Sequence, residues 1–221
     1  MKTAIKNIVA ITYKPFLEKY LSKKRIYTYG NIKLQIPPEV FHPGFFTSTQ
    51  FLLQYIKKIP LQAKNFLELG AGNGLISMYA ARLRSKVTAS DINPVAVEFL
   101  KINSEENDLR LNIVQSDLFE NIPIQQFDII AINPPYYKKN PKTLLDHAWY
   151  CGENGEFFFG LFIQLPKYIH KDSEVFMVLC DGCDMGMIEE AANQNGFKLS
   201  CVQIRQSLIE KSFIYKIEKS W

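Results

Sequence analysis

The fold is decided by the stretch FLELGAGNG, residues 66–74, in which an apolar run ends in three closely spaced glycines. An apolar run that leads through a glycine turn into an amphipathic stretch, here residues 75–83, is typical of a strand followed by a helix. Glycines at such a turn let the backbone adopt positive φ angles, and the first turn of the helix presents free N–H groups. The stretch therefore predicts a ligand site at the carboxyl end of a buried strand.

The chain beyond this stretch keeps alternating short apolar runs with longer amphipathic ones, which indicates βαβ units and a largely parallel sheet. Residues 197–204 and 213–218 are predicted to form a terminal antiparallel pair. The sequence thus predicts an α/β fold with a doubly wound, mostly parallel, seven-stranded sheet and an antiparallel last strand. The remaining predicted strands are 66–69, 86–90, 111–115, 127–132 and 174–180, and the predicted helices are 75–83, 155–169, 188–195 and one that begins at Pro94 with Asn93 as its N-cap.

The length of 221 residues fits one domain with a small appendage, at about 150 residues per domain. Basic residues gather at the amino end: residues 1–40 hold eight Lys and Arg against two acids, whereas residues 41–221 hold 18 against 20. We therefore expect a basic, partly helical N-terminal extension, residues 1–44, followed by the main domain, residues 45–221.

Aromatic residues are interleaved with the charges of this extension, as on surfaces that bind RNA through its phosphates and bases. An amphipathic helix that lies on the main domain with its lysines in water accounts for the same pattern, and we favour that interpretation. Contact with RNA through the extension is the alternative. The aromatic residues are Tyr13, Phe16, Tyr20, Tyr27 and Tyr29, and the apolar side of the helix is Ile5, Ile8, Val9, Thr12, Phe16 and Tyr20.

No segment predicts export, a membrane span or a metal site. The apolar run at residues 8–11 is too short for a signal peptide, and no run approaches the ~18 residues of a membrane-spanning helix. We expect a cytoplasmic protein with reduced cysteines. Cys180 and Cys183 form a C-x-x-C pattern, but the chain offers no second pair for zinc.

The type of ligand follows from an acid beside the glycine turn. Glu68 lies two residues before Gly70, and the third glycine, Gly74, comes one residue earlier than in the dinucleotide pattern G-x-G-x-x-G. A carboxylate repels a phosphate group but attracts an ammonium or sulfonium group. The turn therefore predicts a cationic nucleoside, and S-adenosylmethionine is the obvious candidate.

Two further acids follow the next two predicted strands. Asp91 is placed to accept hydrogen bonds from both hydroxyls of a ribose, and Asp117 to accept one from the adenine amine, with Leu118 over the ring. Because parallel strands end at one edge of a sheet, we expect a single crevice there. The predicted cofactor-binding residues are Glu68, Gly70, Ala71, Gly72, Gly74, Asp91, Ile92, Asp117 and Leu118.

The sequence Asn133-Pro134-Pro135-Tyr136 follows the predicted central strand and indicates the reaction. An sp² nitrogen has a delocalised lone pair, so two acceptors that hold both of its N–H bonds orient it towards a methyl donor. The side-chain oxygen of Asn133 and the carbonyl of Pro134 are the predicted acceptors, the prolines fix the backbone, and Tyr136 offers a stacking face. These four are the predicted catalytic residues, and Asn133 is also assigned to the cofactor site.

Residues 66–137 resemble class I S-adenosylmethionine-dependent methyltransferases of the NPPY group, which methylate planar nitrogens in proteins and nucleic acids. Residues 151–168 resemble the stretch after the catalytic loop in HemK-like glutamine methyltransferases. TQFLL, residues 49–53, is similar to that family's Thr-Glu-Leu-Leu at the lid of the cofactor pocket, which implies that Thr49 contacts the cofactor. VFHPGFF, residues 40–46, also resembles the entry to the small methyltransferase domain of ribosomal RNA guanine methyltransferases.

Three functions remain in competition, each with a macromolecular partner. The first is an N-methyltransferase for the side-chain amide of a protein glutamine, and the second uses the same cofactor on an exocyclic base amine of ribosomal or transfer RNA. An amide and a base amine present the same two N–H bonds to Asn133, so this motif fits both. The third is a non-catalytic scaffold that binds RNA or protein, against which the intact catalytic motif argues.

Overall fold

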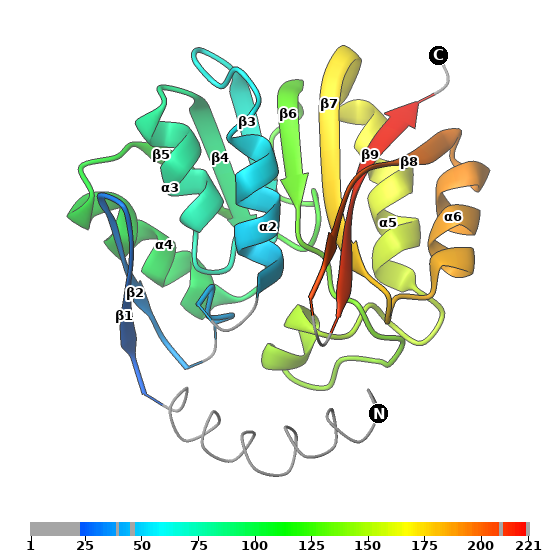
Figure 1. Ribbon diagram of the computed structural model, residues 1–221, viewed down its shortest axis with the longest axis horizontal. Coiled ribbons are helices and arrows are strands. Elements are labelled where there is room, and N and C mark those ends of the chain that lie inside the picture. The colour runs from blue at the N-terminus through cyan, green and yellow to red at the C-terminus, as the bar shows by residue number, and fades with distance from the viewer. Residues whose placement is uncertain (1–22, 39, 45–46, 208–209, 220–221) are drawn as a thin grey trace.

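The computed structural model describes residues 23–38, 40–44, 47–207 and 210–219. Its main sheet has seven strands in the order β5-β4-β3-β6-β7-β9-β8 (Figure 1). The five strands from β5 to β7 are parallel, and β9 is antiparallel to both of its neighbours. The predicted fold class is therefore confirmed. The strands are β3 (Asn65–Leu69), β4 (Lys86–Asp91), β5 (Leu111–Gln115), β6 (Phe127–Ile132), β7 (Ile169–Cys180), β8 (Phe197–Gln206) and β9 (Lys211–Lys219).

Helices cover both faces of this sheet, because its central strands are apolar on both sides. Phe66 of β3 joins the core under the helices of one face, and Leu67 joins the core under the helices of the other. One face carries α2 (Thr47–Ile56), α3 (Leu75–Arg82) and α4 (Pro94–Glu106), and the other carries α5 (Glu156–Gln164) and α6 (Met185–Gln194). Two short 3₁₀ helices, η1 (Leu145–Ala148) and η2 (Leu165–Lys167), complete the described helical elements.

One predicted helix is too long. The helix expected at residues 155–169 ends at Gln164, because Pro166 has no backbone N–H to continue it and the chain tightens into η2. Strand β7 then begins at Ile169, five residues before the expected start at Glu174. The predicted N-cap of α4 is confirmed, since the side chain of Asn93 accepts a hydrogen bond from Val95 N at 2.9 Å.

The described part of the N-terminal extension forms strands that were not predicted from the sequence. Two antiparallel strands, β1 (Arg25–Tyr29) and β2 (Ile32–Ile36), form a hairpin whose Leu34 and Ile36 are buried in the core beside α2 and α3. The alternation of apolar and polar residues in IKLQI was the signal for a strand. The helix predicted from Ile5 to Tyr20 lies outside the described residues, and the division at residue 44 stays a prediction.

Asn103 of α4 and Asn107, the residue that follows α4, pair with the hairpin in place of a neighbouring strand. Asn103 accepts from Gln35 N at 2.7 Å and donates to Gln35 O at 3.1 Å, and Asn107 does the same for Lys33 at 3.0 and 2.7 Å. Residues four apart lie on one face of a helix, so both amides reach β2. The hairpin is thereby fixed to the main domain.

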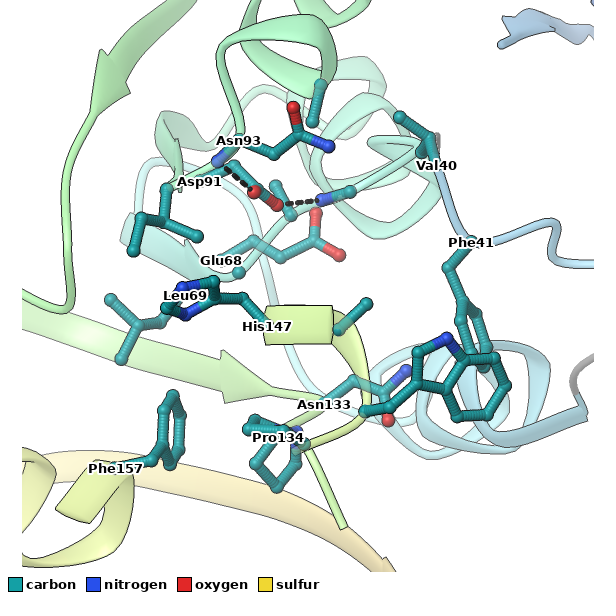
Figure 2. Close-up of a pocket in the computed structure, with 18 of the residues that line it drawn as sticks. Val40, Phe41, Glu68, Leu69, Asp91, Asn93, Asn133, Pro134, His147 and Phe157 are labelled. Atoms are coloured by element: carbon teal, nitrogen blue, oxygen red, sulfur yellow. Dashed lines mark hydrogen bonds between the residues drawn. The ribbon is translucent and has the colours of Figure 1, made fainter. Parts of the chain in front are cut away.

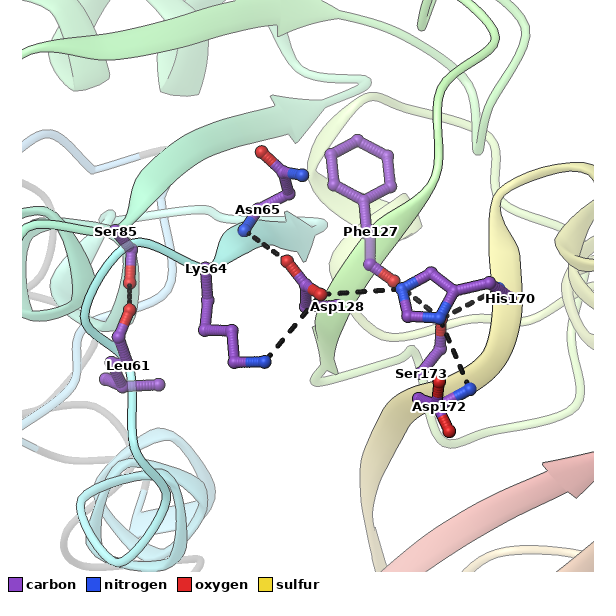
Figure 3. Close-up of polar contacts among 9 residues, drawn as sticks. All are labelled: Leu61, Lys64, Asn65, Ser85, Phe127, Asp128, His170, Asp172 and Ser173. Atoms are coloured by element: carbon purple, nitrogen blue, oxygen red, sulfur yellow. Dashed lines mark hydrogen bonds and ion pairs between the residues drawn. The ribbon is translucent and has the colours of Figure 1, made fainter.

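Polar contacts close the end of the sheet where the parallel strands begin (Figure 3). Asp128 of β6 accepts from Asn65 N at 2.7 Å, and its carboxylate lies 3.8 Å from Lys64 Nζ and 3.5 Å from His170 Nε2. Ser173 donates to Phe127 O at 2.7 Å beside them. This end is thus occupied by structural contacts, and the opposite end carries the cavity described next. None of the helices in the described ranges is long and apolar enough to cross a membrane.

Candidate active site

A cavity of about 130 Å³ opens at the carboxyl ends of β3, β4 and β6 (Figure 2). Every residue predicted for the cofactor or the catalytic site lines it, except Gly74. The structure therefore brings these residues together at one cavity, and their roles remain predictions. The predicted residues in the lining are Thr49, Glu68, Gly70, Ala71, Gly72, Asp91, Ile92, Asp117, Leu118, Asn133, Pro134, Pro135 and Tyr136.

The glycine turn needs its glycines for conformation and for space. Gly70, Gly72 and Gly74 have φ angles of 72°, 51° and 78°, a region that side-chain-bearing residues rarely adopt. A Cβ at Gly74 would lie 2.4 Å from a methyl group of Leu100. Gly74 thus acts from behind the cavity wall, where it lets α3 begin close against α4.

Glu68 is held by the first turn and a half of α3. Its Oε2 accepts from Ser77 N at 2.7 Å and from Ser77 Oγ at 2.5 Å, and the residue is only 5% exposed. Burial raises the pKa of the Glu68 carboxyl to about 8, and the nearby Asp91 carboxylate raises it further, against the two bonds from Ser77. The carboxyl therefore carries a proton at neutral pH until a cationic group comes beside it.

Asp91 closes the glycine turn. Its two oxygens accept from Gly72 N at 2.7 Å and from Asn93 N at 2.9 Å (Figure 2). Burial raises the pKa of Asp91, and these backbone bonds and the nearby His147 act in the opposite direction. Asp91 does not cap α4, because the side chain of Asn93 makes that contact.

The loop after β5 brings two predicted residues to the cavity. The buried Ser116 accepts from Asn121 N at 2.9 Å, which folds the loop back on itself. Leu118 has a φ angle of 46° and lies against Gly160 of α5, where a Cβ would be 2.8 Å from a Leu118 methyl group. This contact aims the exposed Asp117 and the half-buried Leu118 along the cavity wall.

The side chain of Asn133 is fixed by three hydroxyl groups. Its amide nitrogen donates to Ser48 Oγ and Thr49 Oγ1, both at 3.3 Å, and its Oδ1 accepts from the Tyr136 hydroxyl at 2.9 Å. The buried surroundings raise the pKa of Tyr136 well above 10, so its hydroxyl stays a donor. An amide oxygen has two lone pairs, and one remains for an acceptor's N–H. Thr49, predicted as a cofactor contact, here positions Asn133.

The sequence did not reveal a second wall of the cavity. Leu144, His147, Ala148 and Trp149, in and around η1, line it together with Phe41 and Phe157. Trp149 O accepts from Tyr136 N at 3.1 Å and Tyr137 N at 2.9 Å, and its ring lies 5.1 Å from that of Phe41. These residues occupy irregular loops, where no periodicity marks which side chains turn inward. The signal in the sequence was Trp149, a large aromatic residue in a polar loop.

The charges of the lining select the kind of ligand. Three carboxyl groups, those of Glu68, Asp91 and Asp117, face the cavity, and no Lys or Arg is among the described residues that line it. A phosphate-bearing nucleotide would meet three carboxyl groups and no Lys or Arg there, whereas a nucleoside with a cationic tail would be attracted. These three carboxyl groups thus fit S-adenosylmethionine.

The C-x-x-C cysteines lie near this site without forming part of its wall. The sulfurs of Cys180 and Cys183 are 3.9 Å apart in the turn before α6. Within the described ranges, no group of three or more His, Cys, Asp or Glu side chains is placed to hold a metal ion.

Residues 31–150 match the family model of the methyltransferase small domain. Over 150 residues the chain is 35% identical to the "Putative protein N5-glutamine methyltransferase MJ0928" of Methanocaldococcus jannaschii, which covers 65% of this chain and 74% of that protein. It is also 33% identical over 111 residues to the tRNA1(Val) (adenine(37)-N6)-methyltransferase of Shewanella loihica, with 46% of each chain covered.

Among solved structures, the fold is similar to that of the Thermus thermophilus 16S rRNA N2 G1207 methyltransferase RsmC in complex with AdoMet and guanosine. The TM-score is 0.61 at 18% identity, and the match covers 88% of this chain and 50% of that one. At this identity the likeness concerns the fold alone.

Proposed function

This chain belongs to the methyltransferase small domain family, and we propose that it methylates the side-chain amide nitrogen of a glutamine in a protein. It is an S-adenosylmethionine-dependent N-methyltransferase, so the proposal concerns the identity of the acceptor and the roles of the residues. The observation that carries it is the fixed amide of Asn133, which leaves one acceptor lone pair at the edge of the cavity.

The cofactor side of the site holds and orients the methyl donor. We assign the ribose hydroxyls to Asp91, the adenine amine to Asp117 and the cationic amino acid end to Glu68, on the acid-lined walls of the cavity. When bound, S-adenosylmethionine supplies an electrophilic methyl group on a sulfonium. The glycine turn lets the backbone approach this ligand closely.

The acceptor side orients a nitrogen that is a poor nucleophile. Asn133 Oδ1 and Pro134 O each hold one N–H of the –NH₂ group, which favours a lone pair directed at the methyl carbon. The carbon–sulfur bond breaks as the nitrogen–carbon bond forms, and one N–H proton then leaves to water. No strongly basic group is required, because methylation makes that nitrogen acidic.

Similarity supports the glutamine acceptor, since the relative with 35% identity bears the name of a protein glutamine methyltransferase. A second candidate is an exocyclic base amine in RNA. It is favoured by the similarity to a tRNA adenine-N6 methyltransferase and by the exposed Lys23 and Lys24 before β1. A scaffold without catalysis is set aside, because the chain is an enzyme by its family.

The acceptor class is tested by incubating the purified protein with S-adenosylmethionine labelled in its methyl group and an extract of cells that lack the enzyme. The product is divided between ribonuclease and protease. Label that survives ribonuclease and is released by protease supports glutamine, and mass spectrometry of the labelled peptide then gives the position. Label released by ribonuclease contradicts the glutamine acceptor and supports the base amine.

A further inference from the structure

The net charge of this protein is small, but basic and acidic residues are unevenly distributed along the chain. Residues 23–86 contain ten Lys and Arg but only two acids, Glu39 and Glu68, whereas residues 87–221 contain 12 Lys and Arg and 19 acids. Glu68 faces the cavity with a pKa of about 8 and adds little negative charge at neutral pH. The positive part of the chain builds the hairpin β1–β2, α2 and α3, which lie together on one side of the sheet.

Four exposed basic residues at the ends of α2 and α3 form what we call the basic patch: Lys57, Lys58, Arg82 and Arg84. Lys57 Nζ lies 5.5 Å from the ring centres of both Tyr29 and Tyr79, and Arg82 Nη2 is 3.3 Å from Asn31 O. These contacts bring the turn of the hairpin against the ends of both helices. The basic patch is therefore one continuous surface.

The neighbours that hold these cations are neutral. Lys57 also reaches the Tyr29 hydroxyl at 3.4 Å, and Lys58 Nζ donates to Gln203 Oε1 at 2.9 Å and lies 5.7 Å from the Tyr55 ring centre. Within the ranges that the structure describes, no carboxylate lies within 4.0 Å of the charged groups of the basic patch. Its positive charge is thus ordered but not neutralised.

We propose that the basic patch binds the phosphate backbone of a single-stranded or looped RNA segment. Rings interleaved with cations suit a chain of phosphates that carries bases and sugars, because tyrosine faces stack on bases while lysine and arginine take the phosphates. Tyr29, Tyr55 and Tyr79 are half-buried against the core, with the ammonium group of Lys57 or Lys58 over each ring. The inference is independent of which nitrogen the enzyme methylates, since it concerns binding alone.

The basic patch and the cavity lie at opposite ends of α2. Thr49 lines the cavity, and Lys58 lies nine residues further on, which is about 14 Å along a helix at 1.5 Å per residue. A stacked strand covers that distance in about four nucleotides at 3.4 Å each. RNA on the basic patch therefore binds at the end of the sheet where the parallel strands begin, and a strand of at least about four nucleotides is needed to reach from there along α2 to the cavity.

The test compares two triple variants of the full chain that lose the same charge. One is Lys57→Gln/Lys58→Gln/Arg82→Gln in the basic patch, and the other is Lys101→Gln/Lys171→Gln/Lys198→Gln at exposed positions elsewhere. The probe is a fluorescent 20-nucleotide single-stranded RNA, and its dissociation constant is measured by anisotropy between 50 and 200 mM salt. Thermal melting confirms that both variants fold.

Losing three phosphate contacts lowers the slope of log K against log salt by about 2, at about 0.7 per phosphate, and weakens binding at 0.1 M salt by at least about tenfold. The variant at Lys101, Lys171 and Lys198 keeps the wild-type slope, and Lys57→Arg/Lys58→Arg keeps the affinity. Equal loss in both triple variants, or wild-type protein without salt-dependent RNA binding, overturns the proposal. Binding of vesicles that contain phosphatidylserine in place of RNA assigns the surface to membranes and overturns it as well.

Discussion

Asn133 is the residue whose surroundings explain most about the site. Its type and place, directly after β6, were evident from the sequence, and so was its expected role towards an –NH₂ group. Its partners Ser48 and Thr49 were not evident, because 84 and 85 residues separate them from Asn133 and only the folded sheet brings α2 to this edge. A local pattern identifies the group that acts but not the groups that hold it.

Replacement of the positioning hydroxyl should separate catalysis from cofactor binding. Thr49→Ala removes one hydrogen bond of about 0.5–1.5 kcal/mol, so we expect kcat to fall about 2- to 12-fold while KM for S-adenosylmethionine stays within about twofold. Thr49→Ser keeps the hydroxyl and should restore kcat. Steady-state kinetics with Thr28→Ala, an exposed change on β1, gives the control.

A rise in KM for S-adenosylmethionine at unchanged kcat would contradict this role. It would instead support the direct cofactor contact that the resemblance of residues 49–53 to the family's lid sequence implied.

Glu68 should make cofactor binding depend on pH. Its pKa of about 8 in the free protein means that the carboxyl is protonated at neutral pH, and a cationic ligand favours the ionised form. Binding therefore releases a proton, and the affinity for S-adenosylmethionine should rise as pH increases from 6.5 to 8.5, by up to about tenfold per unit below pH 8. Titration calorimetry at several pH values measures this dependence.

Glu68→Gln supplies the matched comparison, because the amide keeps the size of the side chain and cannot ionise. We expect this variant to bind S-adenosylmethionine more weakly and to lack the rise in affinity with pH that ionisation of Glu68 causes. If wild-type and Glu68→Gln proteins show the same change with pH, Glu68 does not face the cationic group.

At the scale of elements, the segment around η1 controls how much space the site offers. The cavity of about 130 Å³ is smaller than the ~300–1,000 Å³ of usual ligand pockets, and Leu144, His147 and Trp149 occupy one wall. The glycine turn and the strand ends belong to the packed sheet, whereas this wall is a loop with a short 3₁₀ helix. We therefore expect this segment to shift outward when S-adenosylmethionine binds.

Tryptophan fluorescence should report that movement. In Trp221→Phe protein the emission comes from Trp149 alone, the other of the chain's two tryptophans, and its wavelength should change with a midpoint at the dissociation constant for S-adenosylmethionine. Trp149→Phe should abolish the signal. Saturated cofactor binding with unchanged Trp149 emission would show that the segment stays in place.

The elements were predictable where burial alone dictates the pattern. Strand β6 matches its predicted bounds, residues 127–132, because a buried strand of a parallel sheet appears as a short apolar run, and the edge strand β5 matches at residues 111–115 although none of its residues is buried. The end of α5 was missed because Pro166 permits a 3₁₀ turn that merges with the helix in an apolar sequence. The hairpin β1–β2 was missed because the charges around it were read as an extension.

At the scale of the whole molecule, the two ends of the parallel strands differ: one end holds structural contacts and the other holds the predicted site residues. Asp128, Lys64 and His170 join segments where the parallel strands begin, and the predicted site residues gather where those strands finish (Figures 2 and 3). The basic hairpin, α2 and α3 cover one face of the sheet, and the basic patch lies at the end where the parallel strands begin. An RNA bound to the basic patch must thus extend along α2 to bring an acceptor group to the site.

The central claim is that Asn133 holds the acceptor nitrogen and not the methyl donor. The most direct measurement compares wild-type and Asn133→Ala protein in two ways: the dissociation constant for S-adenosylmethionine by calorimetry, and transfer of labelled methyl groups to macromolecules in an extract from cells that lack the enzyme. We predict a dissociation constant within about threefold of wild type and transfer reduced by at least about a hundredfold, the loss typical when an oriented group that acts in the transition state is removed. Transfer at the wild-type rate, or loss of transfer that follows entirely from loss of cofactor binding, would contradict the account.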